Sequence, residues 1–191
     1  MIKTLTSTKI TPEEFLEMED AASYELVDGQ LVERNMSTLS CLVEGLVYEK
    51  VQGHARPNKL GLVWPGTLGF QCFPKHPKKV RKPDVSFVKA ARLTAELLDT
   101  GHFPLAPDLA VEVISPGDLA HEVAEKIEEY REVDVALIWV IEPMLRIVDV
   151  YRKNGVNSRL RETDELDGED VLPGFRCRVS ELFPELPGTT K

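Results

Sequence analysis

One acidic residue inside an apolar segment places the strongest constraint on how this chain folds. Residues 109–114 read Leu-Ala-Val-Glu-Val-Ile, the near-continuous apolar pattern of a strand buried on both faces. A carboxylate such as Glu112 is costly in that setting unless it is paired, protonated or bound to a cation. Two interpretations stay open at this point: a buried ion pair or neutral, hydrogen-bonded acid, and a carboxylate that binds a metal ion.

A second acid, Asp84, comes directly after Pro83 and before residues 85–88, which predict another strand. Alone, an aspartate in this place is an ordinary turn residue. Two carboxylates on neighbouring strands, however, can bind one Mg²⁺, with water and phosphate oxygens completing its coordination. Such a metal generates a hydroxide nucleophile and stabilises charge at phosphorus. The pair of Asp84 and Glu112 therefore predicts a magnesium site for phosphate chemistry.

The segment that follows Glu112 predicts a helix, with a capping box from Ser115 to Asp118 and an end near Tyr130. Asp118, Glu122, Lys126 and Tyr130 recur every four residues, so they share one side of that helix. Lys126 would then fold back toward the carboxylates, where it would orient water or stabilise a transition state. The alternative is a solvent-exposed ion pair between Glu122 and Lys126, which would contribute little stability.

Glu25 is a third acid of interest, and it lies in a predicted β-hairpin. Residues 24–27 and 31–33 flank Asp28-Gly29, a pair typical of a two-residue hairpin turn. Strand alternation places Glu25 on the opposite face from Leu26. Glu25 then points either at the same site as the other acids or at solvent, and both interpretations stay open.

Helices and strands alternate along the rest of the chain. This pattern predicts an α/β fold with a mixed sheet, and a length of 191 residues fits a single domain spanning 1–191. The expected helices cover residues 11–18, 37–54, 91–98 and a turn near 181–183, and the expected strands cover parts of 61–80 and residues 136–141 and 145–151.

Charge argues weakly against a nucleic-acid partner, because 23 basic and 32 acidic residues give a net charge of −9. The distribution is uneven, however. The segment from Lys75 to Arg92 is strongly basic and holds one acid, Asp84. This basic run is either a solvated loop and strand edge or a strip that faces phosphates.

The cysteines and the apolar runs predict a cytoplasmic protein that does not enter a membrane. Cys41, Cys72 and Cys177 stand far apart, which favours neither a disulfide framework nor a structural zinc site. The N-terminal segment lacks the apolar core of a signal peptide, and the longest apolar run is residues 135–141. The four histidines show no ligand spacing, so we expect them at the surface or in packing contacts.

The order and spacing of these segments resemble the PD-(D/E)XK nuclease superfamily, and more closely its Uma-two branch. The resemblance extends from about Thr11 to Phe183, and it is carried by residues 24–29, 81–88, 106–116, 138–140 and 170–175 together with Lys126 and Tyr130. It implies a restriction-endonuclease-like mixed β-sheet flanked by α-helices, and Mg²⁺-dependent cleavage of phosphodiesters.

The resemblance also implies roles for individual residues. Asp84 and Glu112 match the first and second acids of the motif, and the main-chain carbonyl of Val113 would be a further metal ligand. The superfamily's strand lysine falls at Ile114 here, a departure from the general pattern. In the Uma-two branch this lysine lies in the following helix, which would make it Lys126, and Glu25 matches an early acid of that branch.

These observations predict a metal-dependent endonuclease that uses Mg²⁺ or Mn²⁺ to hydrolyse DNA. A homodimer is expected, because two sites can then act on two strands and because twofold dimers are the commonest oligomers. Two alternatives stay open: a catalytically inactive nuclease fold that serves as a binding or scaffold protein, and a phosphodiesterase that acts on a small nucleotide. The acidic net charge suits the last of these, since a short substrate needs no long basic track.

Overall fold

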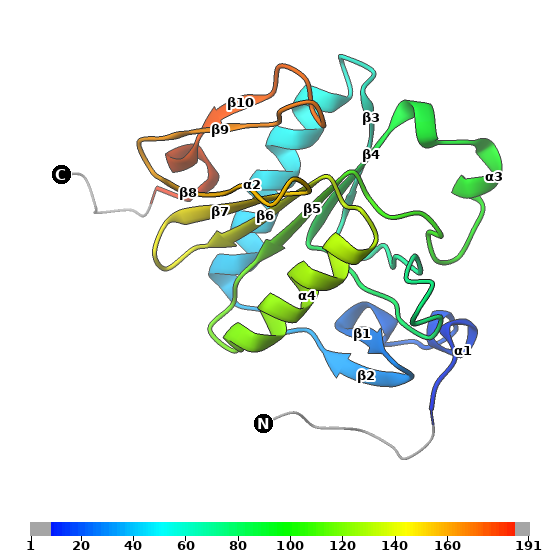
Figure 1. Cartoon of the computed structure of the whole chain (residues 1–191). Coiled ribbons are helices and arrows are strands. Elements are labelled where there is room, and N and C mark those ends of the chain that lie inside the picture. Colours follow the sequence, from blue (N-terminus) through cyan, green and yellow to red (C-terminus); the bar gives the residue numbers. More distant parts are fainter. Residues whose placement is uncertain (1–8, 186–191) are drawn as a thin grey trace.

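A six-stranded mixed sheet forms the centre of the protein, as a computed structural model describing residues 9–185 shows (Figure 1). The strand order is β3-β4-β5-β6-β7-β8, and only the neighbours β5 and β6 run parallel. The strands are β3 (Gly61–Pro65), β4 (Val85–Lys89), β5 (Leu109–Val113), β6 (Leu137–Glu142), β7 (Ile147–Arg152) and β8 (Asn157–Arg161). The predicted α/β class and the mixed sheet flanked by helices are confirmed.

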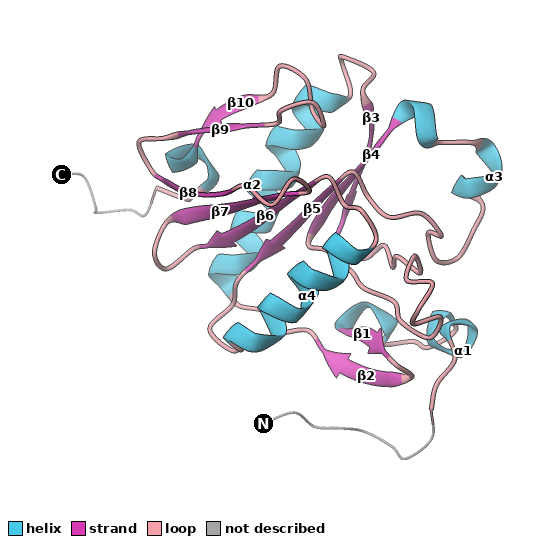
Figure 2. Cartoon of the chain, in the orientation of Figure 1, coloured by secondary structure: helices cyan, strands magenta, loops and turns pink. Residues whose placement is uncertain are grey.

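Two long helices cover opposite faces of this sheet (Figure 2). Helix α2 (Thr38–Ala55) begins at the N-cap Ser37 and packs one side against the apolar face of the sheet. Helix α4 (Ala120–Glu132) packs Ile127 and Tyr130 against the other face. Because α4 connects β5 to β6, the chain can return to the same end of the sheet and pair these two strands in parallel.

Smaller elements surround the sheet and helices. A two-stranded hairpin, β1 (Tyr24–Val27) and β2 (Gln30–Glu33), turns through Asp28 and Gly29, which both have positive φ. A second small ladder pairs β9 (Glu165–Asp167) with β10 (Arg176–Arg178). The other helical segments are α1 (Pro12–Leu16), α3 (Ala95–Leu98), η1 (Ala21–Ser23), η2 (Ala90–Arg92) and η3 (Val179–Leu182).

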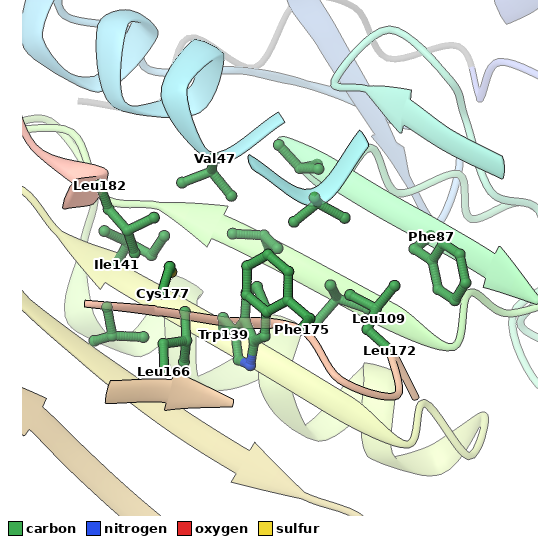
Figure 3. Packing of buried hydrophobic residues seen from close by; sticks show 14 of the residues in the cluster. Val47, Phe87, Leu109, Trp139, Ile141, Leu166, Leu172, Phe175, Cys177 and Leu182 are labelled. Carbon is green, nitrogen blue, oxygen red and sulfur yellow. The ribbon is translucent and has the colours of Figure 1, made fainter. Parts of the chain in front are cut away.

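The main hydrophobic core lies between the sheet, α2 and the C-terminal ladder (Figure 3). Its largest buried side chain is Trp139 of β6, which contacts Phe175 with ring centroids 5.6 Å apart. Alternate residues of the same strands face α4 and form a second core. Both faces of the central strands are therefore buried, which explains why the sequence of β5 is apolar on both sides.

The helix that carries Lys126 begins later than the sequence predicts. The expected capping box from Ser115 to Asp118 is a turn, in which the Ser115 N–H donates to Asp118 Oδ2 at 2.7 Å. The Ser115 hydroxyl is buried and lies 2.7 Å from the hydroxyl of Ser40 in α2, so it cannot serve as the expected cap. The helix starts at Ala120 instead.

Two further parts of the secondary structure differ from the sequence prediction. The helix expected over 91–98 is divided into η2 and α3, because Thr94 is extended and its hydroxyl caps α3 by accepting from the Leu97 N–H. The strands β8, β9 and β10 are absent from the sequence prediction. Strand β8 alternates between exposed and half-buried residues at the edge of the sheet, so it lacks the apolar pattern on which the prediction depends.

Within residues 9–185, no helix is both long and apolar enough to cross a membrane. The three cysteines are all free thiols, which agrees with the expectation of no disulfide framework.

Gly61 is required by the close approach of β3 to β4. A Cβ atom at Gly61 would lie 2.0 Å from the carbonyl oxygen of Val88. We expect Gly61→Ala to lower the free energy of unfolding by about 1–3 kcal/mol, because the strands would have to separate locally. Gly45→Ala is the matched control at an exposed position of α2, where the added Cβ meets nothing within 4 Å. It should raise stability by about 0.5–1 kcal/mol through helix propensity. Urea denaturation of both variants measures the contrast, and equal midpoints would contradict the strand packing described here.

Candidate active site

A cavity of about 230 Å³ opens beside the C-terminal end of β5, and all of the predicted site residues line it. Its walls come from β5, the first half of α4, the β1–β2 hairpin and the residue before β4. It contains Glu25, Asp84, Glu112, Val113 and Lys126 together with Val27, Val32, Glu33, Arg34, Asn35, Arg81, Ile114, Asp118, His121, Glu122, Val123 and Glu125.

The sheet register explains why Asp84 and Glu112 meet at this cavity. Antiparallel pairing aligns Val85 of β4 with Val111 of β5. Continued by one residue, the same register places Asp84 opposite Glu112, where Cβ atoms are about 4.5–5.5 Å apart. Because side chains alternate along a strand, both acids project to the face that α4 covers.

Glu112 is buried, with 5% of its surface exposed. Its Oε2 accepts from Lys126 Nζ at 2.9 Å, and its Oε1 accepts from the Tyr130 hydroxyl at 2.6 Å. Burial raises the pKa of Glu112 to about 7, and the nearby carboxylates of Asp84 and Glu25 add to this rise against the opposing charge of Lys126. Glu112 is therefore both ion-paired and hydrogen-bonded, as one of the two sequence interpretations expects, and it also faces the cavity.

Lys126 folds back toward the carboxylates, as predicted. Its Nζ lies 2.9 Å from Glu112 Oε2 and 3.2 Å from Glu25 Oε2, so it bridges two buried acids. Burial alone would lower the pKa of Lys126, but the two carboxylates raise it above its usual range. Lys126 is thus a fixed cation inside the site, and it does not use its side chain for the alternative surface pair with Glu122.

Glu25 points at the site and not at solvent. Its Oε2 accepts from Arg81 Nη1 at 3.0 Å, and its Oε1 accepts from the Lys82 main-chain N–H at 2.8 Å. Burial would raise the pKa of Glu25, but Lys126 and Arg81 outweigh it and lower the pKa to about 2. Leu26 is also buried, because the hairpin packs on both of its sides at this point.

Asp84 is held by two donors. Its Oδ1 accepts from Arg34 Nη2 at 2.6 Å, and its Oδ2 accepts from the main-chain N–H of Val113 at 2.6 Å. Burial raises the pKa of Asp84 against the opposing charges of Arg34 and Lys126. The sequence analysis missed Arg34, which lies 50 positions from Asp84 in the chain and just after the hairpin strand β2. No local pattern around Arg34 marks it as a site residue.

Three of the seven basic residues in the run from Lys75 to Arg92 do not face solvent, whereas Lys75 and Lys78 are exposed. Lys79, Arg81 and Lys82 are all buried. Lys79 and Arg81 both bind Glu129 of α4, and the Lys82 ammonium donates to the carbonyl of Ala21. These residues hold the segment before β4 against α4 and the hairpin, so the alternative of a solvated loop is wrong for these three residues.

The outer wall of the cavity is acidic. Asp118, Glu122, Glu125 and Glu33 line it, beside the exposed His121. His121 is a surface residue as expected, and it is the histidine that lines this cavity. Ring nitrogens of the other three, His54, His76 and His102, lie within 3.0 Å of Pro173 O, Asp28 Oδ1 and Pro12 O, respectively.

The donors at this site suit a hard divalent cation. Across residues 9–185, no group of three or more His, Cys, Asp or Glu side chains is arranged to hold a metal ion. Mg²⁺ does not need such a group, because it is commonly bound by one or two carboxylates and keeps several waters. Asp84 and Glu112 supply oxygen donors of this kind at a shared cavity, and each carboxylate oxygen has lone pairs beyond the single bond it accepts here.

Comparison with known proteins bears on the fold and the family of this chain. The family model Uma2, described as "Putative restriction endonuclease", matches residues 12–180. A solved structure described as a "putative nuclease belonging to DUF820" from Anabaena variabilis superposes with a TM-score of 0.78 and 20% sequence identity, over 91% of this chain and 97% of that one. No curated protein matches the chain. At this identity the solved structure establishes the fold, and the family model, which spans most of the chain, shows that this protein belongs to the Uma2 family of nuclease-like proteins.

Proposed function

We propose that this protein is an endonuclease that uses Mg²⁺ or Mn²⁺ to hydrolyse phosphodiester bonds in DNA. The observation that carries the proposal is the convergence of Asp84, Glu112 and Lys126 on one cavity from three different elements. An acid pair on adjacent strands with a buried lysine beside it supplies metal ligands and a fixed positive charge in one place.

Each residue at the cavity would have a separate role in the reaction. Asp84, Glu112 and the main-chain carbonyl of Val113 would hold the cation, which supplies charge stabilisation and a more acidic water when bound. Lys126 would orient that water and stabilise negative charge on the phosphate. Glu25 would keep Lys126 in place, since its Oε2 lies 3.2 Å from the ammonium.

The acidic outer wall favours a second candidate, a phosphodiesterase that acts on a small nucleotide. Seven acids and three bases line the cavity, and the buried basic residues Lys79, Arg81 and Lys82 offer no track for a polymer. If the substrate is DNA, we propose that a homodimer presents two sites to the two strands. We also propose that the protein acts in the cytoplasm. The substrates in the following assay distinguish the two candidates.

The test is cleavage of supercoiled plasmid, single-stranded DNA and bis(p-nitrophenyl) phosphate in Mg²⁺ or Mn²⁺. We expect metal-dependent nicking that falls at least about 100-fold in Asp84→Asn, which weakens the metal site, and in Lys126→Met, which removes a positive charge that stabilises the transition state. Asp149→Asn is the control, since Asp149 binds Arg159 in the outer strands of the sheet. Cleavage of the small diester alone would support the second candidate.

Two results would count against catalysis. Nicking that persists unchanged in Asp84→Asn would indicate a contaminating nuclease. An absence of cleavage together with an absence of Mn²⁺ binding by calorimetry would favour the binding or scaffold protein.

A further inference from the structure

Of the three cations that line the cavity in residues 9–185, Arg34 is the one paired with a single carboxylate, Asp84. Its Nη2 donates to Asp84 Oδ1 and its Nη1 donates to the Gly66 carbonyl, both at 2.6 Å. A guanidinium carries five N–H donors, so three remain beyond these two bonds. The side chain is 11% exposed, and it lines the cavity beside Asp84 and Glu112.

The other two cations that line the cavity are each paired with two carboxylates. Arg81 uses Nε, Nη1 and Nη2 to bind Glu129 and Glu25, and its side chain is 5% exposed. Lys126 lies between Glu112 and Glu25. An anionic substrate in this acidic cavity can therefore meet further N–H groups of Arg34 in addition to the ammonium of Lys126.

Arg34 is also bonded to an Asp84 oxygen that could bind a metal ion. With Oδ2 bonded to the Val113 N–H, Oδ1 is the Asp84 oxygen that faces the guanidinium. A guanidinium stays charged in proteins, so a divalent cation at the same oxygen would repel it strongly at this separation. The Asp84 oxygens have further lone pairs, so it is charge repulsion that would make the two cations compete at this carboxylate.

Resting on the proposed function, we propose that Arg34 competes with the metal ion for Asp84 and, once displaced, binds the phosphate of the substrate. In the absence of metal it neutralises a buried acid. With metal at Asp84, its planar fork turns into the cavity, where it matches the geometry of a phosphodiester. Arg34 would thereby stabilise the buried Asp84 before the metal ion binds, and it would bind the phosphate of the substrate afterwards.

Two variants separate competition from phosphate binding, with Mn²⁺ binding measured by calorimetry in the absence of DNA. Arg34→Gln removes the competitor, and we expect the dissociation constant for Mn²⁺ to fall at least about tenfold. Gly66→Ala keeps the charge but displaces it, because the new Cβ would lie 2.7 Å from Arg34 Nη2. We expect a smaller tightening in Gly66→Ala, about threefold. Arg159→Gln is the control, since Arg159 is exposed and binds Asp149 in the outer strands of the sheet, and it should leave Mn²⁺ affinity unchanged.

Nicking at saturating Mn²⁺ is the second readout, and it should fall about 100-fold in Arg34→Gln although the metal ion binds more tightly.

Unchanged or weaker Mn²⁺ affinity in both variants would overturn the competition. If circular dichroism shows that Arg34→Gln is unfolded, the Mn²⁺ affinity of Gly66→Ala alone decides. Parent-level nicking in a folded Arg34→Gln would overturn the phosphate contact. If the parent protein binds Mn²⁺ without cleaving any diester, the proposed function fails while the tightening still tests the competition.

Discussion

Replacing Arg81 by leucine is expected to lower the free energy of unfolding by about 3–5 kcal/mol, the largest loss that we expect from any single ion pair in the described part of the chain. Arg81 connects two acids, Glu25 on the hairpin and Glu129 on α4, and all three groups are largely buried. Leucine would leave both carboxylates without this partner, and each would have to be protonated or hydrated at a cost.

Urea denaturation near neutral pH measures this loss, with Arg159→Leu as the matched control. Arg159 also binds an aspartate through two N–H groups, but its side chain is 59% exposed. Exposed pairs contribute about 0–1 kcal/mol, so the control should unfold close to the parent. Similar losses in the two variants would mean that the burial of Arg81 adds nothing to its pairing.

The effect of Arg81 should depend on pH in a defined direction. The pKa of Glu25 is lowered from 4.5 to about 2, so this group stabilises the fold above pH 4.5 and the contribution is lost as the pH falls through about 2. The difference between the parent and Arg81→Leu should therefore shrink as the pH is lowered over this range. A difference in free energy of unfolding that stays constant from neutral to acidic pH would show that Arg81 stabilises the fold through packing and not through its charge.

The site was predictable from sequence where a residue type conflicts with its neighbours. A glutamate in the apolar strand β5 has few explanations, and the helix that follows this strand carries Lys126 on the same side as Tyr130. Asp84 followed because the strands β4 and β5 could be recognised as apolar runs. In each case the signal is local, within one strand or one helix.

Long-range pairing explains what the sequence did not reveal. The basic run is compatible with a solvent-facing loop until the fold brings Glu129 to Lys79 and Arg81, 50 and 48 positions away. Arg34 is similar, since a polar residue at the end of a hairpin is ordinary until the structure places it on Asp84. Charges that are buried in pairs follow no periodic pattern, so only tertiary structure identifies them.

Glu112→Gln should abolish metal-dependent cleavage, with a loss of at least about 1000-fold, while the protein stays folded. The amide has nearly the same shape as the carboxylate, so its oxygen can still accept from Tyr130, and Lys126 keeps Glu25 as its ion partner. What is lost is one negative charge at the cavity, and with it the carboxylate that Mg²⁺ or Mn²⁺ requires. Mn²⁺ calorimetry and plasmid nicking measure the loss, and Glu128→Gln, an exposed change on the same helix, is the control. Full Mn²⁺ affinity in a folded Glu112→Gln would show that the buried glutamate serves the ion pairs of α4 alone, since a metal ligand cannot lose its charge without weakening the ion that it binds.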